Sequence, residues 1–377
     1  MAFEKMISAD CHIVEPPDLW TSRIDKEYLE RGPRLIREDG IDRWYIDGDI
    51  SLGSVGAASE AGVRFDNPDA LSIEAPFERV PTGSFDAVSR IKDQELDGVV
   101  GELVYPTIGT RIYTVDIDSD LTDAAFRASN DWMADFSRDN SSRIKGASLI
   151  NLDDVNEGVK EIERCAKMGL AAAAIPAYIS QEREYYRSEF EPLWEAAQDL
   201  GVPLSMHDGS TRPGPGQVVA FAKDVTVVGV SAFRTTQDYW ARRSIACMMF
   251  GGVFERYPGL KVGVVEYELG WAPYFIYQMD MAYENHRYVT EIQFKNDRVP
   301  SDFFHDNLYV TFMEDPYGLT FRSVIGVDNI LWSSDYPHRE STWPKSRETL
   351  ERIMAGIPEE EKTKITYSNS ARMFGFQ

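Results

Sequence analysis

Eight short apolar segments recur along the chain, and most are followed by a polar turn and then by a helical pattern. This alternation favours a parallel sheet whose strands are joined by crossover helices. Eight strands close a (β/α)8 barrel, and single barrels commonly exceed about 250 residues, so one barrel accounts for all 377 residues. The predicted strands are residues 6–12, 97–105, 145–151, 170–177, 202–208, 261–267, 308–314 and 330–335.

Amphipathic patterns between these segments predict helices. Val155, Val159 and Ile162 recur at helical spacing, and the pair Leu200-Gly201 places a glycine where helices commonly end. The predicted helices are residues 120–138, 153–168, 189–200 and 345–355.

The stretch of residues 13–90 separates the first two predicted strands and is far too long for an ordinary βα loop. Two short strand patterns flank Asp47-Gly48, which is a hairpin signal. We interpret the stretch as an insertion into a single domain of residues 1–377. We expect it to form either a lid over an active site or a surface segment without a functional role. A second irregular stretch, residues 209–225, is expected to form a loop after the fifth strand.

Composition limits the classes of partner. The net charge of −23 disfavours nucleic acid and anionic membranes, because phosphate binding needs a clustered basic face. No apolar segment approaches the ~20 residues of a membrane span, and no signal peptide is evident. The three cysteines match neither a disulfide framework nor a thiolate metal motif. We therefore expect a cytoplasmic protein that acts on a small molecule.

Three of the five histidines lie at or just after the end of a predicted strand, at the catalytic rim of a barrel. Asp10 and His12 lie two residues apart in the first strand, so both side chains point to one face. His207 ends the fifth strand and Asp335 ends the eighth, with His338 three residues further. Carboxylates and imidazoles together suit Zn²⁺ or Mn²⁺. Each residue alone also fits a structural role, but the four strand-end positions together predict a metal site.

Several motifs are similar to those of the amidohydrolase-related family of TIM-barrel metal enzymes, which contains aminocarboxymuconate semialdehyde decarboxylase and the aryl decarboxylases. The resemblance spans nearly the whole chain and implies a homodimer. It also implies one divalent ion, Zn²⁺ first and Mn²⁺ second, held by Asp10, His12, His207 and Asp335. The motifs are Ala9-Asp10-Cys11-His12, Ser205-Met206-His207, Tyr257-Pro258-Gly259-Leu260-Lys261-Val262, Gly270-Trp271-Ala272-Pro273-Tyr274 and Trp332-Ser333-Ser334-Asp335-Tyr336-Pro337-His338.

The sequence departs from the family pattern at two positions. The first motif begins with Asp10, where better-known members have His or Glu. At the end of the sixth strand, where the family commonly has a histidine, this chain has Glu266. We predict that Glu266 is a general base beside a metal-activated water, with Asp335 as the second catalytic residue and Glu268 as a weaker candidate. A purely structural ion pair is the alternative for Glu266.

Hydrolysis and non-oxidative decarboxylation can both run on this arrangement. A glutamate in place of histidine favours hydrolysis, so we predict a hydrolase acting on a small, cyclic or aromatic carboxylate-type substrate. The first alternative is a decarboxylase of an aromatic or muconate-type acid, which the named relatives favour. The second is a catalytically inactive metal-binding barrel. A phosphate-binding barrel is disfavoured, because no Gly-rich phosphate loop follows the seventh or eighth strand.

Candidate substrate-binding residues lie near the predicted strand ends. His338 and Arg339 follow the eighth strand, and Trp20 and Tyr105 can wall an apolar pocket. Arginines can pair with a substrate carboxylate, although ordinary surface charge is the alternative for each. Further candidates for these roles are Arg212, Arg234 and Trp271, whereas His286 and His305 are predicted to be structural.

Overall fold

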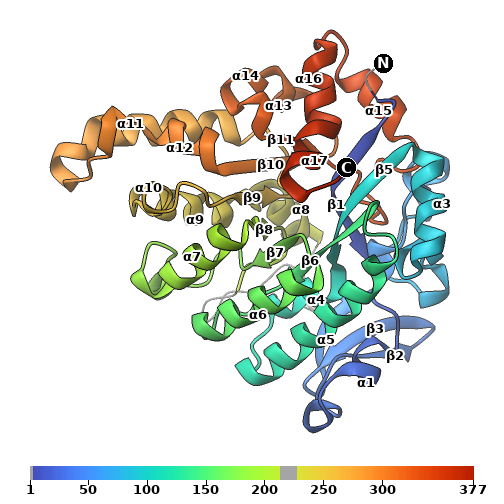
Figure 1. Cartoon of the computed structure of the whole chain (residues 1–377). Helices are drawn as coiled ribbons and strands as arrows, with labels where there is room; N and C mark the ends of the chain where they lie inside the picture. Colours follow the sequence, from blue (N-terminus) through green and yellow to red (C-terminus); the bar gives the residue numbers. More distant parts are fainter. Residues whose placement is uncertain (1–2, 213–226) are drawn as a thin grey trace.

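The computed structural model describes residues 3–212 and 227–377, and its centre is a barrel of eight parallel strands (Figure 1). Along the sheet the strands follow one another in chain order, and each hydrogen-bonded pair of neighbours is parallel. The predicted barrel is therefore confirmed. Its strands are β1 (Met6–Ile13), β5 (Val99–Pro106), β6 (Ile144–Leu149), β7 (Ala172–Ile175), β8 (Leu204–His207), β9 (Val262–Val265), β10 (Leu308–Phe312) and β11 (Ile330–Trp332).

The strands are buried along almost their whole length, because helices cover the outside and side chains fill the inside. This explains why they read as apolar runs rather than as alternating patterns. Inside the barrel, the hydroxyl of Ser205 lies 2.8 Å from that of Tyr105 and 2.9 Å from that of Tyr309. Gly263 makes room for Tyr309, since a Cβ there would lie 2.2 Å from the ring.

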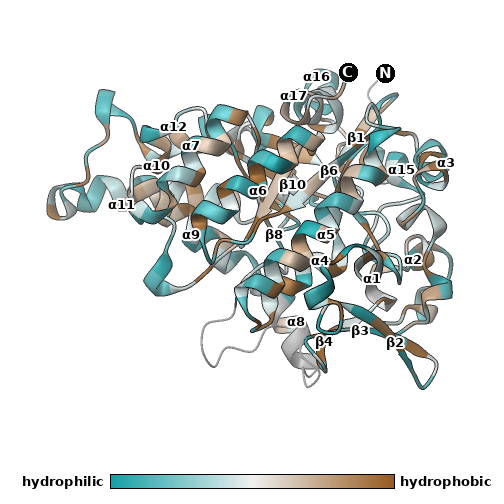
Figure 2. Ribbon diagram, turned by 60° about the horizontal axis from the view of Figure 1, so that its bottom comes forward, coloured by the Kyte–Doolittle hydropathy of each residue, from teal (hydrophilic) through white to brown (hydrophobic). Residues whose placement is uncertain are grey.

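Helices surround the barrel with their polar faces outward (Figure 2). The four predicted helices are confirmed as α5, α6, α7 and α15, and aspartate side chains cap the first two of these at Asp118 and Asp154. The α-helices are α1 (Leu19–Arg23), α2 (Val63–Asp66), α3 (Ala87–Asp97), α4 (Thr107–Arg111), α5 (Ser119–Arg138), α6 (Val155–Met168), α7 (Glu191–Leu200), α8 (Val227–Thr236), α9 (Asp238–Phe250), α10 (Val253–Arg256), α11 (Ala272–Thr290), α12 (Pro300–Asn307), α13 (Pro316–Thr320), α14 (Arg322–Ile325), α15 (Ser346–Ile353), α16 (Glu359–Thr363) and α17 (Asn369–Phe374).

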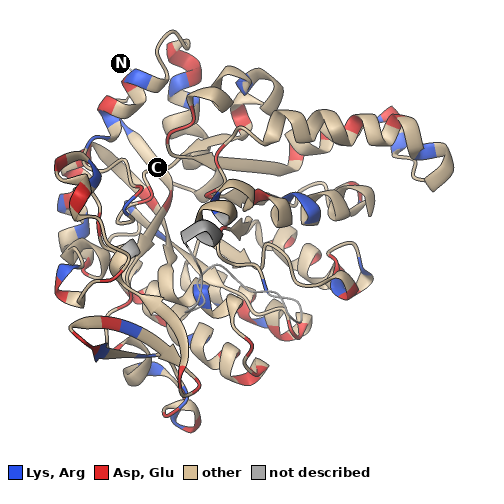
Figure 3. Cartoon of the chain, turned by 180° about the vertical axis from the view of Figure 1, so that it is seen from behind, with Lys and Arg blue, Asp and Glu red and all other residues tan. Residues whose placement is uncertain are grey.

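Basic and acidic residues are interspersed over the outer helices and loops (Figure 3). None of the helices in the described part of the chain combines the length and apolar character that crossing a bilayer requires. Most of the predicted loop at 209–225 falls outside the described residues.

The insertion after β1 contains an antiparallel sheet of β2 (Arg34–Glu38), β3 (Ile41–Ile46) and β4 (Ile50–Ser54). The predicted hairpin is confirmed: Asp47 and Gly48 both have positive φ, as its tight turn requires. The insertion contacts the loop that follows β11, where the Ala61 N–H donates to the Pro337 carbonyl at 3.0 Å. Its role as a lid stays a prediction.

The barrel closes between β1 and β11, which lie at the two ends of the strand order. Beyond β11, the Asp335 N–H donates to the Asp10 carbonyl at 3.0 Å, and the His12 N–H donates to the Tyr336 carbonyl at 2.7 Å. The Ser334 N–H also donates to the Ser8 hydroxyl at 2.8 Å. These bonds bring the predicted ligands of the first and eighth strands side by side.

Candidate metal centre

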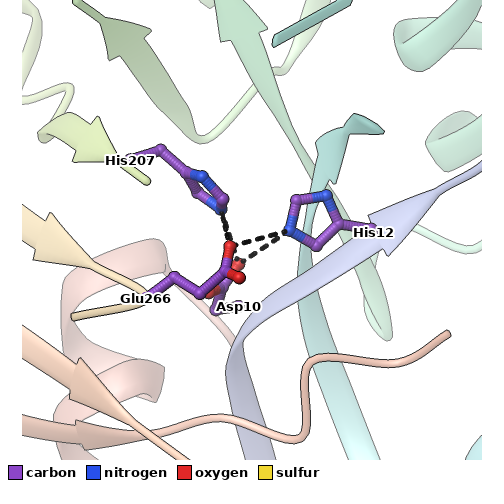
Figure 4. Close-up of side chains that lie close together, drawn as sticks. All are labelled: Asp10, His12, His207 and Glu266. Carbon is purple, nitrogen blue, oxygen red and sulfur yellow. Dashed lines mark hydrogen bonds and ion pairs between the residues drawn. The ribbon is translucent and has the colours of Figure 1, made fainter. Parts of the chain in front are cut away.

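Asp10, His12, His207 and Glu266 meet at the C-terminal ends of β1, β8 and β9 (Figure 4). Nε2 of His207 lies 3.3 Å from Oδ1 of Asp10 and 3.5 Å from Oε2 of Glu266. Nε2 of His12 lies 3.6 Å from the same Asp10 oxygen. As predicted, Asp10 and His12 point to one face of their strand.

Asp335 and His338 extend the cluster from the loop after β11. Oδ1 of Asp335 lies 3.6 Å from Nε2 of His12 and 3.0 Å from Nδ1 of His338. The rings of His12 and His338 stack with centroids 4.0 Å apart. Within the described residues, two overlapping groups with metal-binding geometry share His12 and Glu266: one adds Asp10 and His207, the other Asp335 and His338.

Two of the acidic residues adopt an unusual backbone conformation. Glu266 has a φ of 68° and Asp335 a φ of 56°, in the left-handed region that non-glycine residues rarely occupy. The Glu266 backbone is held by its N–H, which donates to the Thr311 hydroxyl at 2.9 Å, and by its carbonyl, which accepts from the Gln237 amide at 2.9 Å. Strain of this kind concentrates at functional sites, where the surrounding structure maintains it.

Three atoms of the cluster are buried without a hydrogen-bond partner among the described residues: Asp10 Oδ2, His12 Nε2 and Asp335 Oδ1. Burying an unsatisfied polar atom is costly, so such atoms call for a ligand. Two donors about 2.1 Å from one ion are about 3.0 to 3.4 Å apart at octahedral or tetrahedral angles. The donor separations of 3.3–3.6 Å are close to this range. The residues therefore fit a divalent cation.

The electrostatics of the cluster also favour a cation. Burial and the nearby Asp335 raise the pKa of Glu266 well above its ordinary value, and burial and Asp10 do the same to the pKa of Asp335. Burial lowers the pKa of His12. Burial opposes a charge on His207 too, but contacts with Asp10 and Glu266 raise its pKa to about 10. Three carboxylates thus lie together in one buried space, and the positive charge around them is too small to neutralise them.

The predicted aromatic residues occupy different surroundings. The Tyr105 ring centroid lies 4.8 Å from that of His207, so Tyr105 borders the cluster. Trp20 is fully buried, its indole N–H donates to the Ala125 carbonyl at 2.9 Å, and its ring packs on Trp44. None of these Trp20 contacts involves the cluster, so its role in substrate binding stays a prediction.

Of the predicted arginines, Arg234 comes nearest to the cluster. It pairs with Asp208 at 3.1 Å, and its Nη1 lies 3.6 Å from Oε1 of Glu266. Arg212 pairs with Asp153 at 3.1 Å, and Arg339 donates to Glu340 at 3.1 Å. Neither of these two pairs involves a cluster residue, and the binding of a substrate carboxylate by Arg212 and Arg339 stays a prediction.

The remaining candidates make structural contacts. The Glu268 carboxylate accepts a hydrogen bond from the Met313 N–H at 3.3 Å, and burial raises its pKa to about 7. The Trp271 indole donates to the Glu268 carbonyl at 3.0 Å. The ring of His305 lies 2.9 Å from the Val324 carbonyl, which agrees with its predicted structural role.

Sequence reasoning missed Thr107 and Glu15. The Thr107 hydroxyl donates to the Ile13 carbonyl at 2.6 Å and lies 3.3 Å from Nδ1 of His12. The buried Glu15 carboxylate accepts the N–H groups of Ile108 and Gly109 at 2.9 and 2.8 Å, and so anchors the start of α4. Thr107 follows a predicted strand end, a position that could have identified it; Glu15 carried no comparable signal.

The effect of burial on the Glu15 carboxyl group can be tested through the pH dependence of stability. Burial raises its pKa to about 7 from an ordinary value of 4.5, against the opposing backbone hydrogen bonds. Folding therefore favours the protonated form, and this contribution is present below pH 4.5 and is lost as the pH rises through 7. Relative to Glu15→Gln, the wild type should lose up to about 3 kcal/mol of unfolding free energy between pH 4.5 and 8. Urea unfolding of both proteins at the two pH values measures this, and a pH-independent difference contradicts it.

Comparisons with known proteins identify the family of this chain. A family model described as Amidohydrolase matches residues 113–376, which include His207, Glu266 and Asp335. A curated relative, the gamma-resorcylate decarboxylase of Polaromonas sp. (strain JS666), is 25% identical over 271 residues, covering 68% of this chain and 78% of the relative.

Two solved structures share the fold over almost the full chain. The 5-carboxyvanillate decarboxylase of Sphingomonas paucimobilis is 21% identical with a TM-score of 0.70, covering 99% of both chains. A dihydroxybenzoic acid decarboxylase from Polaromonas sp. JS666, with bound manganese and the inhibitor 2-nitroresorcinol, is 19% identical with a TM-score of 0.62, covering 98% of this chain and 97% of the other.

These relatives correct the predicted reaction. The prediction of a hydrolase, which depends on Glu266 standing where a histidine is usual, is wrong: the curated relative and both of these solved structures are decarboxylases. A single substituted side chain was a weak basis, since a carboxyl group can serve a proton transfer in either reaction. The preference for Zn²⁺ is likewise unsupported, because the Polaromonas structure holds manganese.

Proposed function

The chain belongs to the amidohydrolase family, and from this premise we propose that it is a metal-dependent decarboxylase that removes CO₂ from a small aromatic carboxylic acid. The observation that carries the proposal is the buried group of three carboxylates and neighbouring imidazoles at the rim of a barrel whose curated relative is a decarboxylase. Comparable clusters on the same fold also serve other reactions, so the assignment rests on the site and the relative together.

We propose that Asp10, His12, His207 and Asp335 hold one divalent ion. Three of these four residues carry the buried atoms that lack a hydrogen-bond partner in the described part of the chain. Oxygen-rich donor sets suit manganese, and the manganese of the Polaromonas structure supports the same choice. When bound, the ion supplies positive charge that attracts substrate oxygens and stabilises negative charge developing on the ring.

The chemistry requires one proton. The bond between the ring carbon and the carboxylate breaks, its electron pair stays on the ring carbon, CO₂ leaves, and that carbon takes a proton. Glu266 is the proposed donor, because its carboxyl group borders the cluster and is only 9% exposed. Arg234, 3.6 Å from Glu266, would stabilise the carboxylate that remains after the transfer.

Three further predictions accompany this proposal. Tyr105 walls the site beside His207, and the insertion covers the barrel mouth and limits access of water. The homodimer stays a prediction, supported by the exposed tyrosines Tyr274, Tyr277 and Tyr288 on α11. Sedimentation of the purified chain tests the dimer.

The activity is tested by CO₂ release. The protein loaded with Mn²⁺ is offered gamma-resorcylate, 5-carboxyvanillate and, for comparison, benzoate, which lacks the ring hydroxyl. We expect release from at least one hydroxylated acid, little from benzoate, and none after the metal is removed by a chelator. Hydrolysis of amides or lactones without CO₂ release would contradict the proposal. Metal binding without turnover on a broad panel of aromatic acids would favour the inactive barrel.

A further inference from the structure

We propose that Arg90, on α3, is a positioning residue that fixes the chain segments carrying His12 and Asp335. This inference rests on the proposed metal site. The hydrogen bonds of Arg90 go to Glu102 and to backbone carbonyls, and not to the cluster side chains.

The guanidinium of Arg90 bridges the seam at which the barrel closes. Its Nη1 donates to the His12 carbonyl at 2.7 Å, and its Nη2 lies 3.4 Å from the carbonyl of Tyr336, the residue after Asp335. The same Tyr336 carbonyl accepts the His12 N–H. One planar group therefore connects the two segments that each supply proposed ligands.

A second residue holds Arg90 in place. Nε of Arg90 donates to Oε2 of Glu102, on β5, at 2.6 Å, and the Gln94 amide donates to the same oxygen at 2.9 Å. The guanidinium carbon also lies 4.6 Å from the centre of the Tyr336 ring. Arg90 is 0% exposed and Glu102 3% exposed, so both charges are fully desolvated.

Burying an ion pair is expensive and by itself contributes little to stability. Its retention here is explained by geometry, because the planar arginine fork reaches Glu102 and the backbone carbonyls of His12, Gly83 and Tyr336 from fixed directions. A lysine at the same position offers one flexible ammonium group and cannot reproduce the bridge. Precise placement of metal ligands depends on such supporting contacts, whose loss typically weakens metal binding about 10–100-fold.

The test compares Mn²⁺ affinity with stability. The purified chain is stripped of metal and titrated calorimetrically with Mn²⁺, at a temperature where circular dichroism shows every variant to be folded. Arg90→Lys should weaken Mn²⁺ binding about 10–100-fold. Asn307→Ala is the matched control, because the buried Asn307 amide binds the Leu260 carbonyl at 2.8 Å at the far end of the barrel. It should lower Tm while leaving Mn²⁺ affinity unchanged.

A second variant guards against misfolding of Arg90→Lys. Glu102→Gln keeps the shape of the side chain but removes the charge that holds Arg90, and it should weaken Mn²⁺ binding by a smaller factor. Wild-type affinity in both variants, with a lower Tm alone, would overturn the inference. If the wild-type chain binds Mn²⁺ but releases no CO₂, the proposed decarboxylase activity is refuted, and the inference about Arg90 stands. A wild-type chain that binds no Mn²⁺ overturns both.

Discussion

Replacing His207 by alanine is expected to remove the bound metal and to abolish CO₂ release. His207 is the proposed ligand from β8, it is 1% exposed, and its Nε2 lies 3.3 Å from Oδ1 of Asp10. Loss of contacts that only support ligands costs about 10–100-fold in metal affinity, so loss of a ligand should cost more than about 100-fold. The measurement is elemental analysis of the protein after gel filtration, which should show far less than one metal per chain.

Two further variants make the result specific. Asp335→Asn should also lower the metal content, because it neutralises a second proposed ligand, whose buried Oδ1 has no hydrogen-bond partner among the described residues. His305→Ala is the control, since His305 contacts the Val324 carbonyl and lies outside the cluster. It should keep its metal. Stoichiometric metal in both His207→Ala and Asp335→Asn would refute the assigned site.

The fold could be predicted from sequence because the barrel strands are buried on both faces. Strands β6 to β11 contain few polar residues and appear as isolated apolar runs, whereas β2 is half exposed and polar, and it went unrecognised. Helix α5 was placed to within one residue, because its apolar stripe and its aspartate cap are both local signals.

The clustering of the candidate ligands could be predicted because barrel enzymes place their chemistry at strand ends. This rule brought Asp10, His12, His207 and Asp335 together without any knowledge of their contacts. The role of Arg90 could not be predicted from the sequence, because it depends on hydrogen bonds to the carbonyls of His12 and Tyr336. Such bonds form only in the tertiary structure and produce no periodic pattern in the sequence. The positive φ of Glu266 could not be predicted for the same reason.

The reaction itself could not be read from the ligands. A metal held by carboxylates and imidazoles supports both hydrolysis and decarboxylation, and the proton-carrying group in each can be a carboxylic acid. The relatives, rather than any residue of the cluster, separate the two reactions. Which carboxyl group moves the proton is a separate question, and replacement of Glu266 tests it.

Replacing Glu266 by glutamine is expected to preserve metal content while lowering kcat for CO₂ release about 10²–10⁴-fold, the usual contribution of general acid–base catalysis. Glutamine keeps the length and shape of the side chain beside Arg234 but has no proton to deliver to the ring carbon. The matched control is Glu268→Gln. Glu268 lies two residues further on, also has a positive φ of 58°, and contacts the Met313 N–H.

The two glutamate variants separate three roles for Glu266. Loss of turnover with full metal content, in Glu266→Gln alone, supports proton delivery. Loss of metal would make Glu266 a ligand, as its place in the group with Asp10, His12 and His207 allows, and would leave Asp335 as the remaining carboxyl group for the proton. Unchanged turnover would reduce Glu266 to an ion-pair partner of Arg234 and would contradict the proposed proton path.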